Sequence, residues 1–379
     1  MTRFPILDVC ARIEGHGLQH KLLNEHCLDF TAWKEMLILA EKEGMAPLLK
    51  KHLDESESIY PISVRRSLNI LYKRHQHEAE VRFGVLQGIL VHLYQKGLNP
   101  LVIKGAALCH TTYSDAALRP MRDIDLLFRK NEVDRAQKIM QESGFKQSKA
   151  PIPQNHHHLP SLHKTVEDVD ICFELHRDLY PNCPPYYPEV DFEKLLKRAK
   201  LFKIGEVDAR TSSDEETLHY IYQHSLRAPL TYEPFKLINA ADIIGFTEKH
   251  CSRINFDYIK RTYPLLHQVL PLMHHISPWD FDKIPESLAD AEYGKARSPN
   301  PFKGWPQKRL KEFKAEGNRL PHIILNTFLP SSWWIAAYYG ATPVYERLIC
   351  YLWRHPKHVY WWVKLMWSMR QRDNSTAGL

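Results

Sequence analysis

The chain is organised around two apolar stretches, Leu-Val-Ile-Lys-Gly-Ala-Ala at residues 101–107 and Leu-Arg-Pro-Met-Arg-Asp-Ile-Asp-Leu-Leu-Phe at residues 118–128. The first stretch predicts a short buried strand that ends in a glycine turn, and the second predicts another strand. Side chains alternate between the faces of a strand, so Asp123 and Asp125 share one face while Ile124 points into the core. The Cα atoms of the two aspartates then lie about 6.5 Å apart, which suits two carboxylates that hold a metal ion.

The residue types around this aspartate pair favour a nucleoside triphosphate as ligand. Carboxylate oxygens are hard ligands that suit Mg²⁺ together with substrate phosphates. Gly105 lets the backbone approach a ligand closely, and the amide groups of such a turn can hold a phosphate beside Lys104. An isolated Asp-x-Asp is more often a solvated turn or an ion-pair partner. Here the pair lies in an otherwise apolar strand, where uncompensated charge is costly, and we interpret it as a metal site.

Several short motifs of this chain carry a family resemblance: Lys104-Gly105-Ala106, Tyr113, Arg119, Asp123-Ile124-Asp125-Leu126-Leu127, Gly144-Phe145 and Glu174-Leu175-His176. They resemble the bacterial nucleotidyltransferase-like family of the polymerase beta superfold. The resemblance implies an α+β fold in which a mixed sheet has covering helices, with further helices before and after it. It also implies transfer of a nucleoside monophosphate from an NTP, with Mg²⁺ or Mn²⁺, to a hydroxyl-type acceptor. We expect that acceptor to be a small molecule, a saccharide or a peptide.

The resemblance also implies roles for individual residues. Asp123 and Asp125 correspond to catalytic metal ligands. Nucleotide-binding roles carry over onto Lys104, Gly105, Ala106 and Arg119. Gly105-Ala106 departs from the Gly-Ser or Gly-Gly of the broader superfold, so one hydroxyl that could bind the triphosphate is missing.

A third carboxylate is expected from a hairpin whose arms are residues 150–163 and 170–176. Alternation in the second arm puts Asp170 and Glu174 on one face, together with Cys172 and His176. Either carboxylate could accept the proton of the acceptor or complete a second metal site. The resemblance favours Glu174 as the catalytic residue and metal ligand.

His156, His157 and His158 raise the alternative of a separate metal site, with His163 nearby. Consecutive residues of a strand point to opposite faces, so three in a row converge on one ion only where the backbone is irregular. The spacing also lacks the usual i, i+4 pair. We therefore interpret these side chains as surface or substrate-groove histidines.

The composition is ordinary for a soluble protein. The 379 residues are 44% hydrophobic and 25% charged, and this length predicts two or three units. Seven cysteines without a Cys-x-x-Cys pair indicate reduced thiols and argue against a structural zinc site. The sequence has no apolar stretch typical of a signal peptide and no run long enough to span a bilayer. We expect a cytoplasmic protein.

The pattern along the chain predicts four regions. We expect N-terminal helices over residues 1–60 and the nucleotidyltransferase domain over residues 61–180. Residues 181–284 predict a helical domain. Residues 285–379 predict a loop, over 285–308, that is followed by basic, aromatic-rich helices.

The basic residues are concentrated at the end of the chain. Residues 301–379 carry twelve Lys and Arg against four Asp and Glu, which leaves the rest near neutrality and does not favour nucleic acid as a partner. Six of the nine tryptophans lie beyond residue 330. We expect segment 343–372 to contact either the inner face of an anionic membrane or a second copy of the chain. The alternative is that its tryptophans pack onto the helical domain.

Two other functions stay open. A glycosyltransferase also uses Asp-x-Asp to hold a metal and a nucleotide-sugar, but the Lys104-Gly105 turn before the aspartates disfavours that class. The other alternative is a catalytically idle nucleotide-binding module on the same fold, which the alanine at position 106 motivates.

Overall fold

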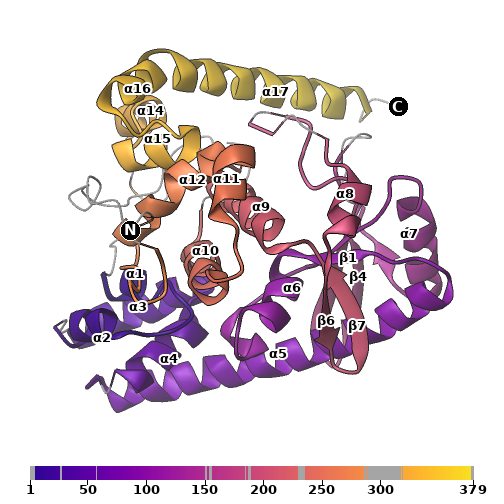
Figure 1. The fold of residues 1–379 in the computed structure, drawn as a ribbon, viewed down its shortest axis with the longest axis horizontal. Coiled ribbons are helices and arrows are strands. Elements are labelled where there is room, and N and C mark those ends of the chain that lie inside the picture. Colours follow the sequence, from indigo (N-terminus) through magenta and orange to yellow (C-terminus); the bar gives the residue numbers. More distant parts are fainter. Residues whose placement is uncertain are drawn as a thin grey trace.

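The computed structural model describes residues 5–25, 28–56, 58–149, 152, 156–183, 185–186, 189–228, 235–285, 288, 317 and 319–376. It has a mixed α+β architecture, as the sequence predicted, with a central sheet and helices before and after it (Figure 1). The predicted loop over 285–308 falls almost entirely outside these residues.

The strands are β1 (Leu101–Ile103), β2 (Ile124–Leu127), β3 (Lys146–Gln147), β4 (Leu162–Val166), β5 (Val169–His176), β6 (Lys200–Ile204) and β7 (Val207–Thr211). The α-helices up to the sheet and within it are α1 (Pro5–Val9), α2 (Gly17–Asn24), α3 (Phe30–Lys42), α4 (Ala46–Glu55), α5 (Ile62–Gln95), α6 (Lys104–Thr111) and α7 (Val133–Glu142). Those that follow are α8 (Phe192–Lys197), α9 (Asp214–Leu226), α10 (Leu237–His250), α11 (Phe256–Thr262), α12 (Pro264–Val269), α14 (Leu320–Phe328), α15 (Ser332–Tyr339), α16 (Val344–Ile349) and α17 (His355–Thr376).

The central sheet has the strand order β1-β2-β5-β4-β3. Strands β2 and β5 are parallel, whereas the other neighbouring pairs are antiparallel. This confirms the expected mixed sheet and a hairpin that ends in β5. The first arm of that hairpin is β4, at residues 162–166, and not residues 150–163 as expected. A second hairpin, β6–β7, was not predicted from the sequence.

One face of the sheet packs on α5 and α7. Ile124 and Leu126 of β2 and Phe173 of β5 are fully buried in this layer, as strand alternation requires. The long helix α5 begins directly after Pro61, and Gly97, at φ +76°, follows its end in the left-handed conformation.

The opposite face of the sheet carries the polar residues of interest. Leu101, Ile103 and Leu127 pack there against Leu195 of α8 and Tyr220 of α9. Helices α8 and α9 therefore pack on the face to which Asp125 and Glu174 belong.

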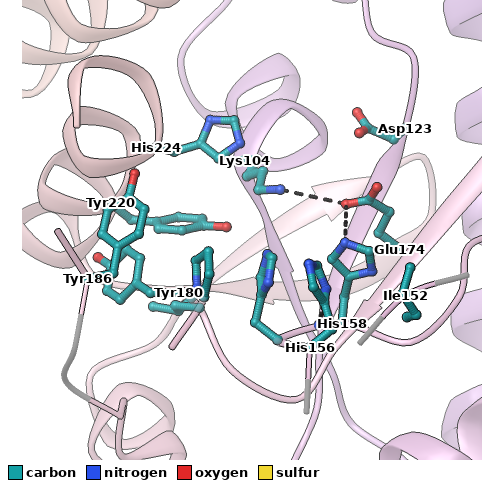
Figure 2. A pocket seen from close by; sticks show the side chains of 13 residues that line it. Lys104, Asp123, Ile152, His156, His158, Glu174, Tyr180, Tyr186, Tyr220 and His224 are labelled. Carbon is teal, nitrogen blue, oxygen red and sulfur yellow. Dashed lines mark hydrogen bonds and ion pairs between the residues drawn. The ribbon is translucent and has the colours of Figure 1, made fainter. Parts of the chain in front are cut away.

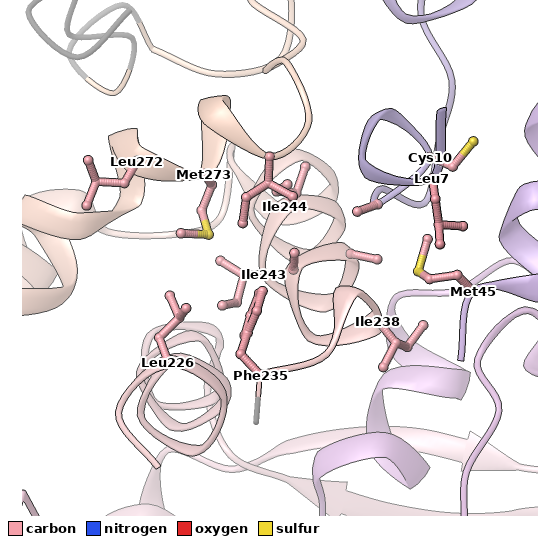
Figure 3. Packing of buried hydrophobic residues seen from close by; sticks show 14 of the residues in the cluster. Leu7, Cys10, Met45, Leu226, Phe235, Ile238, Ile243, Ile244, Leu272 and Met273 are labelled. Carbon is pink, nitrogen blue, oxygen red and sulfur yellow. The ribbon is translucent and has the colours of Figure 1, made fainter. Parts of the chain in front are cut away.

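The largest hydrophobic cluster joins distant parts of the chain. Leu7 and Met45, from the N-terminal helices, share it with Ile244 of α10 and Met273, and Figure 3 shows these side chains converging. Residues of α15 belong to the same cluster, including the buried Trp333. The helices that precede the sheet in the sequence and the helices that follow it thus share one apolar core.

The last helices expose much of their apolar surface. Trp334 and Trp362 are buried with Trp333, so part of the tail packs as core, whereas Trp353 and Trp367 are exposed. Pro356 does not separate two helices, because α17 begins at His355 and continues through it. Within the part of the chain described here, no helix combines the length and the apolar character needed to cross a membrane.

Candidate active site

Strand register brings the acidic residues together. Asp125 of β2 pairs with Ile103 of β1 on one side and with Glu174 of β5 on the other. Two residues farther on, Leu127 pairs with His176. Because neighbouring residues across a sheet point to the same face, the side chains of Asp125, Glu174 and His176 form one group.

The atoms of this group are close enough to share a cation. Asp125 Oδ1 lies 2.8 Å from His176 Nε2, and Glu174 Oε2 lies 3.6 Å from the same nitrogen. One ligand atom from each of the three residues lies within 4.8 Å of the others. Lys104 Nζ is 2.6 Å from Asp125 Oδ1 and 3.9 Å from Glu174 Oε2, so an ammonium group is the charge partner of the carboxylates.

Burial and charge oppose one another in this cluster. Burial disfavours the charged form of Asp125, but Lys104 and the hydrogen bond from His176 hold the pKa of Asp125 far below its usual value. Burial also opposes ionisation of Glu174, and the hydrogen bond with His176 nevertheless lowers the Glu174 pKa. The two carboxylates raise the pKa of His176 despite its complete burial and the nearby Lys104 charge.

Asp123 lies at the edge of the same group. It lines the pocket described below, but it does not belong to the compact trio of Asp125, Glu174 and His176. Burial, followed by the charge of Asp125, raises the Asp123 pKa to about 6. Asp123 lies directly before β2, while the shortest contacts of the group join Asp125 to Lys104 and His176. The competing carboxylate, Asp170, instead accepts a hydrogen bond from Thr165 at the hairpin end.

A pocket of about 310 Å³ opens over these carboxylates. Figure 2 shows Lys104 and Glu174 on one side, with aromatic rings from other elements on the other. Tyr180 stacks on Tyr186 with ring centroids 5.2 Å apart. Pockets of this kind, with an apolar wall and a few converging charged groups, are typical small-molecule sites. The lining residues that the sequence analysis did not assign are Ile152, Leu179, Tyr180, Pro181, Tyr186, Tyr220 and His224.

Arg119 is not brought to the pocket. Its Nε and Nη2 donate to the two oxygens of Asp242 in α10, at 2.8 and 2.7 Å, and Tyr113 donates to the same carboxylate at 2.7 Å. Burial opposes ionisation of the guanidinium, but Asp242 dominates and raises the Arg119 pKa. This arrangement gives Arg119 a structural partner in place of the predicted nucleotide.

Gly105 and Ala106 lie in the first turn of α6, which starts directly after β1. The expected turn is thus replaced by a strand-to-helix junction, and Lys104 is the residue with positive φ, at +52°. A Cβ atom on Gly105 would lie 2.8 Å from Arg119 Cζ and 2.9 Å from Met121 Sδ. The glycine is required by this packing, and the Ala106 side chain is buried in the core. Of these two residues, only the backbone amide groups are suited to bind a phosphate at the helix N-terminus.

The histidine run lies beside the carboxylates. His156, His157 and His158 line the pocket, and His158 Nε2 is 3.9 Å from Glu174 Oε2. Burial lowers the pKa of His156 to about 4 and also lowers that of His158. Burial therefore favours the neutral form of both imidazoles.

One of three comparisons with known proteins gives a match. A family profile described as an uncharacterised nucleotidyltransferase matches residues 30–277, which include every residue of the group. No curated protein and no solved structure matches the chain.

Proposed function

Since the chain belongs to the uncharacterised nucleotidyltransferase family, we propose that it transfers a nucleoside monophosphate from an NTP to a hydroxyl-type acceptor with Mg²⁺. The observation that carries this proposal is the register of β2 and β5, which pairs Asp125 with Glu174 beside Lys104 and the start of α6. This arrangement would bring metal ligands and phosphate-binding groups together, next to the pocket that Lys104, Asp123 and Glu174 line.

The donor set fits a hard divalent cation. Asp125 and Glu174 supply carboxylate oxygens and His176 an imidazole nitrogen, all within 4.8 Å of one another, and Asp123 is adjacent in the pocket. Oxygen ligands of this kind suit Mg²⁺, and the nitrogen makes Mn²⁺ an alternative. When bound, the metal would neutralise charge on the transferred phosphoryl group.

The remaining steps fall to groups of the chain itself. Once a cation neutralises the Asp125 carboxylate, the Lys104 ammonium group can leave its ion pair with Asp125 and bind a phosphate oxygen instead. The amides at the start of α6 can orient the triphosphate, and the rings of Tyr180 and Tyr220 offer an apolar wall for the base or the acceptor. Positioning of this kind accounts for most of the catalysis of phosphoryl-group transfer.

A second candidate is a catalytically idle nucleotide-binding module. The observation that favours it is the ion pair between Lys104 and Asp125, because a built-in ammonium group can replace the metal as partner of the carboxylate. In that case nucleotide binding is independent of Mg²⁺.

Binding assays with site variants test both candidates. We expect Asp125→Asn and Glu174→Gln to reduce Mg²⁺-dependent binding of a non-hydrolysable NTP at least tenfold in calorimetry, while the proteins stay folded by circular dichroism. The matched control is Asp170→Asn, on the same strand as Glu174 but turned to the hairpin end, which should leave binding unchanged. Glu174→Gln should lower turnover more than affinity, because its role lies in the transition state.

Three other outcomes would each favour a different interpretation of the site. NTP binding that needs no Mg²⁺ and survives Asp125→Asn supports the idle module. A preference for nucleotide-sugars over NTPs in a panel with and without Mg²⁺ supports a glycosyltransferase. Loss of activity in Asp170→Asn alone, with Glu174→Gln silent, shows that the third carboxylate is Asp170.

A further inference from the structure

The rings of His156, His157 and His158 converge beside the pocket. The centroid of His156 lies 4.2 Å from those of both His157 and His158, and the latter two are 4.7 Å apart. One ring nitrogen of each residue lies within 4.8 Å of the others. The backbone here is not a regular strand, and only an isolated bridge pairs His158 with His176. The convergence that a regular strand would forbid is therefore present.

One of these rings is oriented by a hydrogen bond, and a second has a buried nitrogen atom without a partner among the described residues. His158 Nδ1 lies 2.7 Å from the carbonyl oxygen of Leu159, so Nδ1 carries the proton and Nε2 keeps its lone pair. Fixing a ring through a backbone carbonyl in this way is typical of metal-ligating histidines. His157 Nδ1 is buried and has no hydrogen-bond partner among the described residues, which is costly for a polar atom unless a ligand binds it.

The backbone holds the run in place. The carbonyl oxygen of His157 accepts hydrogen bonds from the amides of Arg177 and Asp178, at 2.9 and 3.1 Å, just beyond the end of β5. This anchors the histidines to the strand that carries Glu174. The backbone of the histidine run is thus hydrogen-bonded to the residues that follow β5.

We propose that His156, His157 and His158 bind a divalent transition metal of the Zn²⁺ or Co²⁺ type, separate from the carboxylate group. Imidazole nitrogens select such metals, whereas Mg²⁺ prefers oxygen. Three protein ligands leave a coordination position open, and here it faces the pocket. Glu174 lies between the two groups, since its Oε2 is 3.9 Å from His158 Nε2 and 3.6 Å from His176 Nε2. This inference does not depend on the nucleotidyl-transfer reaction.

Titration of tag-free, metal-stripped protein with Co²⁺ tests the site. We expect one equivalent to bind with the visible absorption bands of a nitrogen-ligated, four- or five-coordinate ion, and Zn²⁺ to displace it. His157→Ala should weaken Co²⁺ binding at least tenfold. The matched control is His163→Asn, an exposed histidine on β4, which should bind as the wild type does. Asp125→Asn should retain the Co²⁺ spectrum while it loses Mg²⁺-dependent nucleotide binding.

Three results would overturn the inference. The first is that folded wild-type protein does not bind Co²⁺ tightly. The second is that both His157→Ala and His158→Ala bind Co²⁺ as the wild type does, and the third is that Asp125→Asn loses the Co²⁺ spectrum while the histidine variants retain it. The last result would place the metal at the carboxylates.

A second inference concerns the surface formed by α16, the π-helical turn η5 (Cys350–Arg354) and α17, which we call the tail surface. Its large apolar residues are unusually exposed, with 79% of Leu352, 68% of Trp353 and 67% of Trp367 accessible. Large exposed apolar side chains gathered on consecutive helical segments indicate an interaction site. The exposed members of the tail surface are Val344, Tyr345, Leu348, Ile349, Leu352, Trp353, Tyr360, Trp361, Val363 and Trp367.

The charges on the tail surface point to one kind of partner. Between residues 344 and 367 there are four basic residues and one acidic residue, and Arg354, Lys357 and Lys364 are exposed. Tryptophan and tyrosine side chains favour the headgroup level of a bilayer, and Lys and Arg add attraction to anionic lipids. We propose that the tail surface docks on an anionic membrane, with the helices lying in its plane.

Vesicle sedimentation tests this docking. We expect binding to vesicles that contain phosphatidylglycerol, weaker binding at physiological than at low salt, and little binding to pure phosphatidylcholine. Lys357→Glu with Lys364→Glu should weaken binding at least tenfold, and so should Trp353→Ser with Trp367→Ser. Leu201→Ser, an exposed apolar residue on β6, is the matched control. The proposal is overturned if the protein binds neutral vesicles equally well, or if it binds no vesicles. If the tryptophan variant converts a dimer into a monomer, the tail surface instead binds a second copy of the chain.

Discussion

At the scale of single residues, Gly105 shows how packing can require a glycine within a family motif. The guanidinium of Arg119 occupies the space that a Cβ atom at position 105 would need, and Arg119 is itself fixed by Asp242. Only a glycine lets α6 approach this buried ion pair. The motif resembles a phosphate-binding turn, but its side-chain requirement comes from the core.

We predict that Gly105→Ala destabilises the protein by about 1–3 kcal/mol, because overpacking forces Arg119 or Met121 to move. Urea unfolding monitored by circular dichroism measures this change. Gly88→Ala in α5 is the control: the added methyl meets nothing within 4 Å, and alanine is the better helix former, so stability should rise by up to about 1 kcal/mol. A neutral or stabilising Gly105→Ala would show that Arg119 does not need this space.

Buried His52 makes the free energy of unfolding depend on pH, and the direction of this dependence follows from its pKa. Its Nε2 lies 2.9 Å from the Arg12 carbonyl oxygen, and burial lowers the His52 pKa from 6.5 to about 3. Because the folded-state value is depressed, the stabilisation is complete above pH 6.5 and is lost as the pH falls toward 3. The charged and titratable groups facing it are Lys51, Arg12, His20 and Glu55.

We predict that His52→Gln flattens the pH dependence of stability. Between pH 7.5 and 5 the wild type should lose about 2 kcal/mol more than the variant through this group. Urea unfolding at the two pH values measures the difference, with the exposed His77→Gln as control. Identical slopes for wild type and His52→Gln would mean that His52 is accessible to protons in the folded protein.

At the scale of elements, the β4–β5 hairpin positions Glu174 and His176 beside Asp125. Its two turn residues, Glu167 and Asp168, have φ values of +49° and +60°. Two-residue turns with positive φ at both positions favour Asn-Gly, and other side chains pay a conformational penalty.

We therefore predict that Glu167→Asn with Asp168→Gly stabilises the protein by about 1 kcal/mol, because it relieves that penalty at an exposed site. Asp168→Val is the opposite control, and should destabilise because a β-branched residue resists positive φ. Thermal unfolding separates the two variants. Equal melting temperatures would indicate that the turn relaxes at no cost.

Local periodicity explains which elements could be predicted. The alternation in β5 is a two-residue repeat, so the common face of Glu174 and His176 could be predicted from the sequence. The same repeat predicts that Asp123 shares a face with Asp125, and Asp123 lies just before β2. The start of α6 at Lys104 does not, because it depends on one residue in the left-handed conformation. The weakly patterned β6–β7 hairpin was likewise missed.

The rest of the site depends on contacts between distant parts of the chain. The convergence of His156, His157 and His158 arises in irregular backbone that β5 holds through the His157 carbonyl, and no local pattern encodes it. The pairing of Arg119 with Asp242 joins residues 123 positions apart. Sequence motifs could name Arg119 but could not reveal that its partner is a carboxylate of α10.

At the scale of the whole molecule, a buried ion pair fastens the N-terminal segment to the helical core. Arg12 Nη2 lies 2.6 and 2.8 Å from the two carboxylate oxygens of Glu248 in α10, and both side chains are buried. Arg12 also donates from Nε to the Glu14 carbonyl at 2.6 Å and from Nη1 to the Pro278 carbonyl. The same helix carries Asp242, so α10 links the N-terminal segment to the loop before β2.

We predict that Arg12→Met and Glu248→Leu each destabilise the protein by about 3–5 kcal/mol, because each leaves one buried charge without its partner. The double variant should cost clearly less than the sum of the two, since it removes both charges and retains apolar volume. A double-mutant cycle from urea unfolding measures the coupling. The control is Lys203→Met in the exposed pair with Asp208, at 2.7 Å, where screening limits the change to below about 1 kcal/mol. Additive single effects would mean that Arg12 stabilises the N-terminal segment through its carbonyl contacts, and that the ion pair with Glu248 contributes little to holding the two ends of the core together.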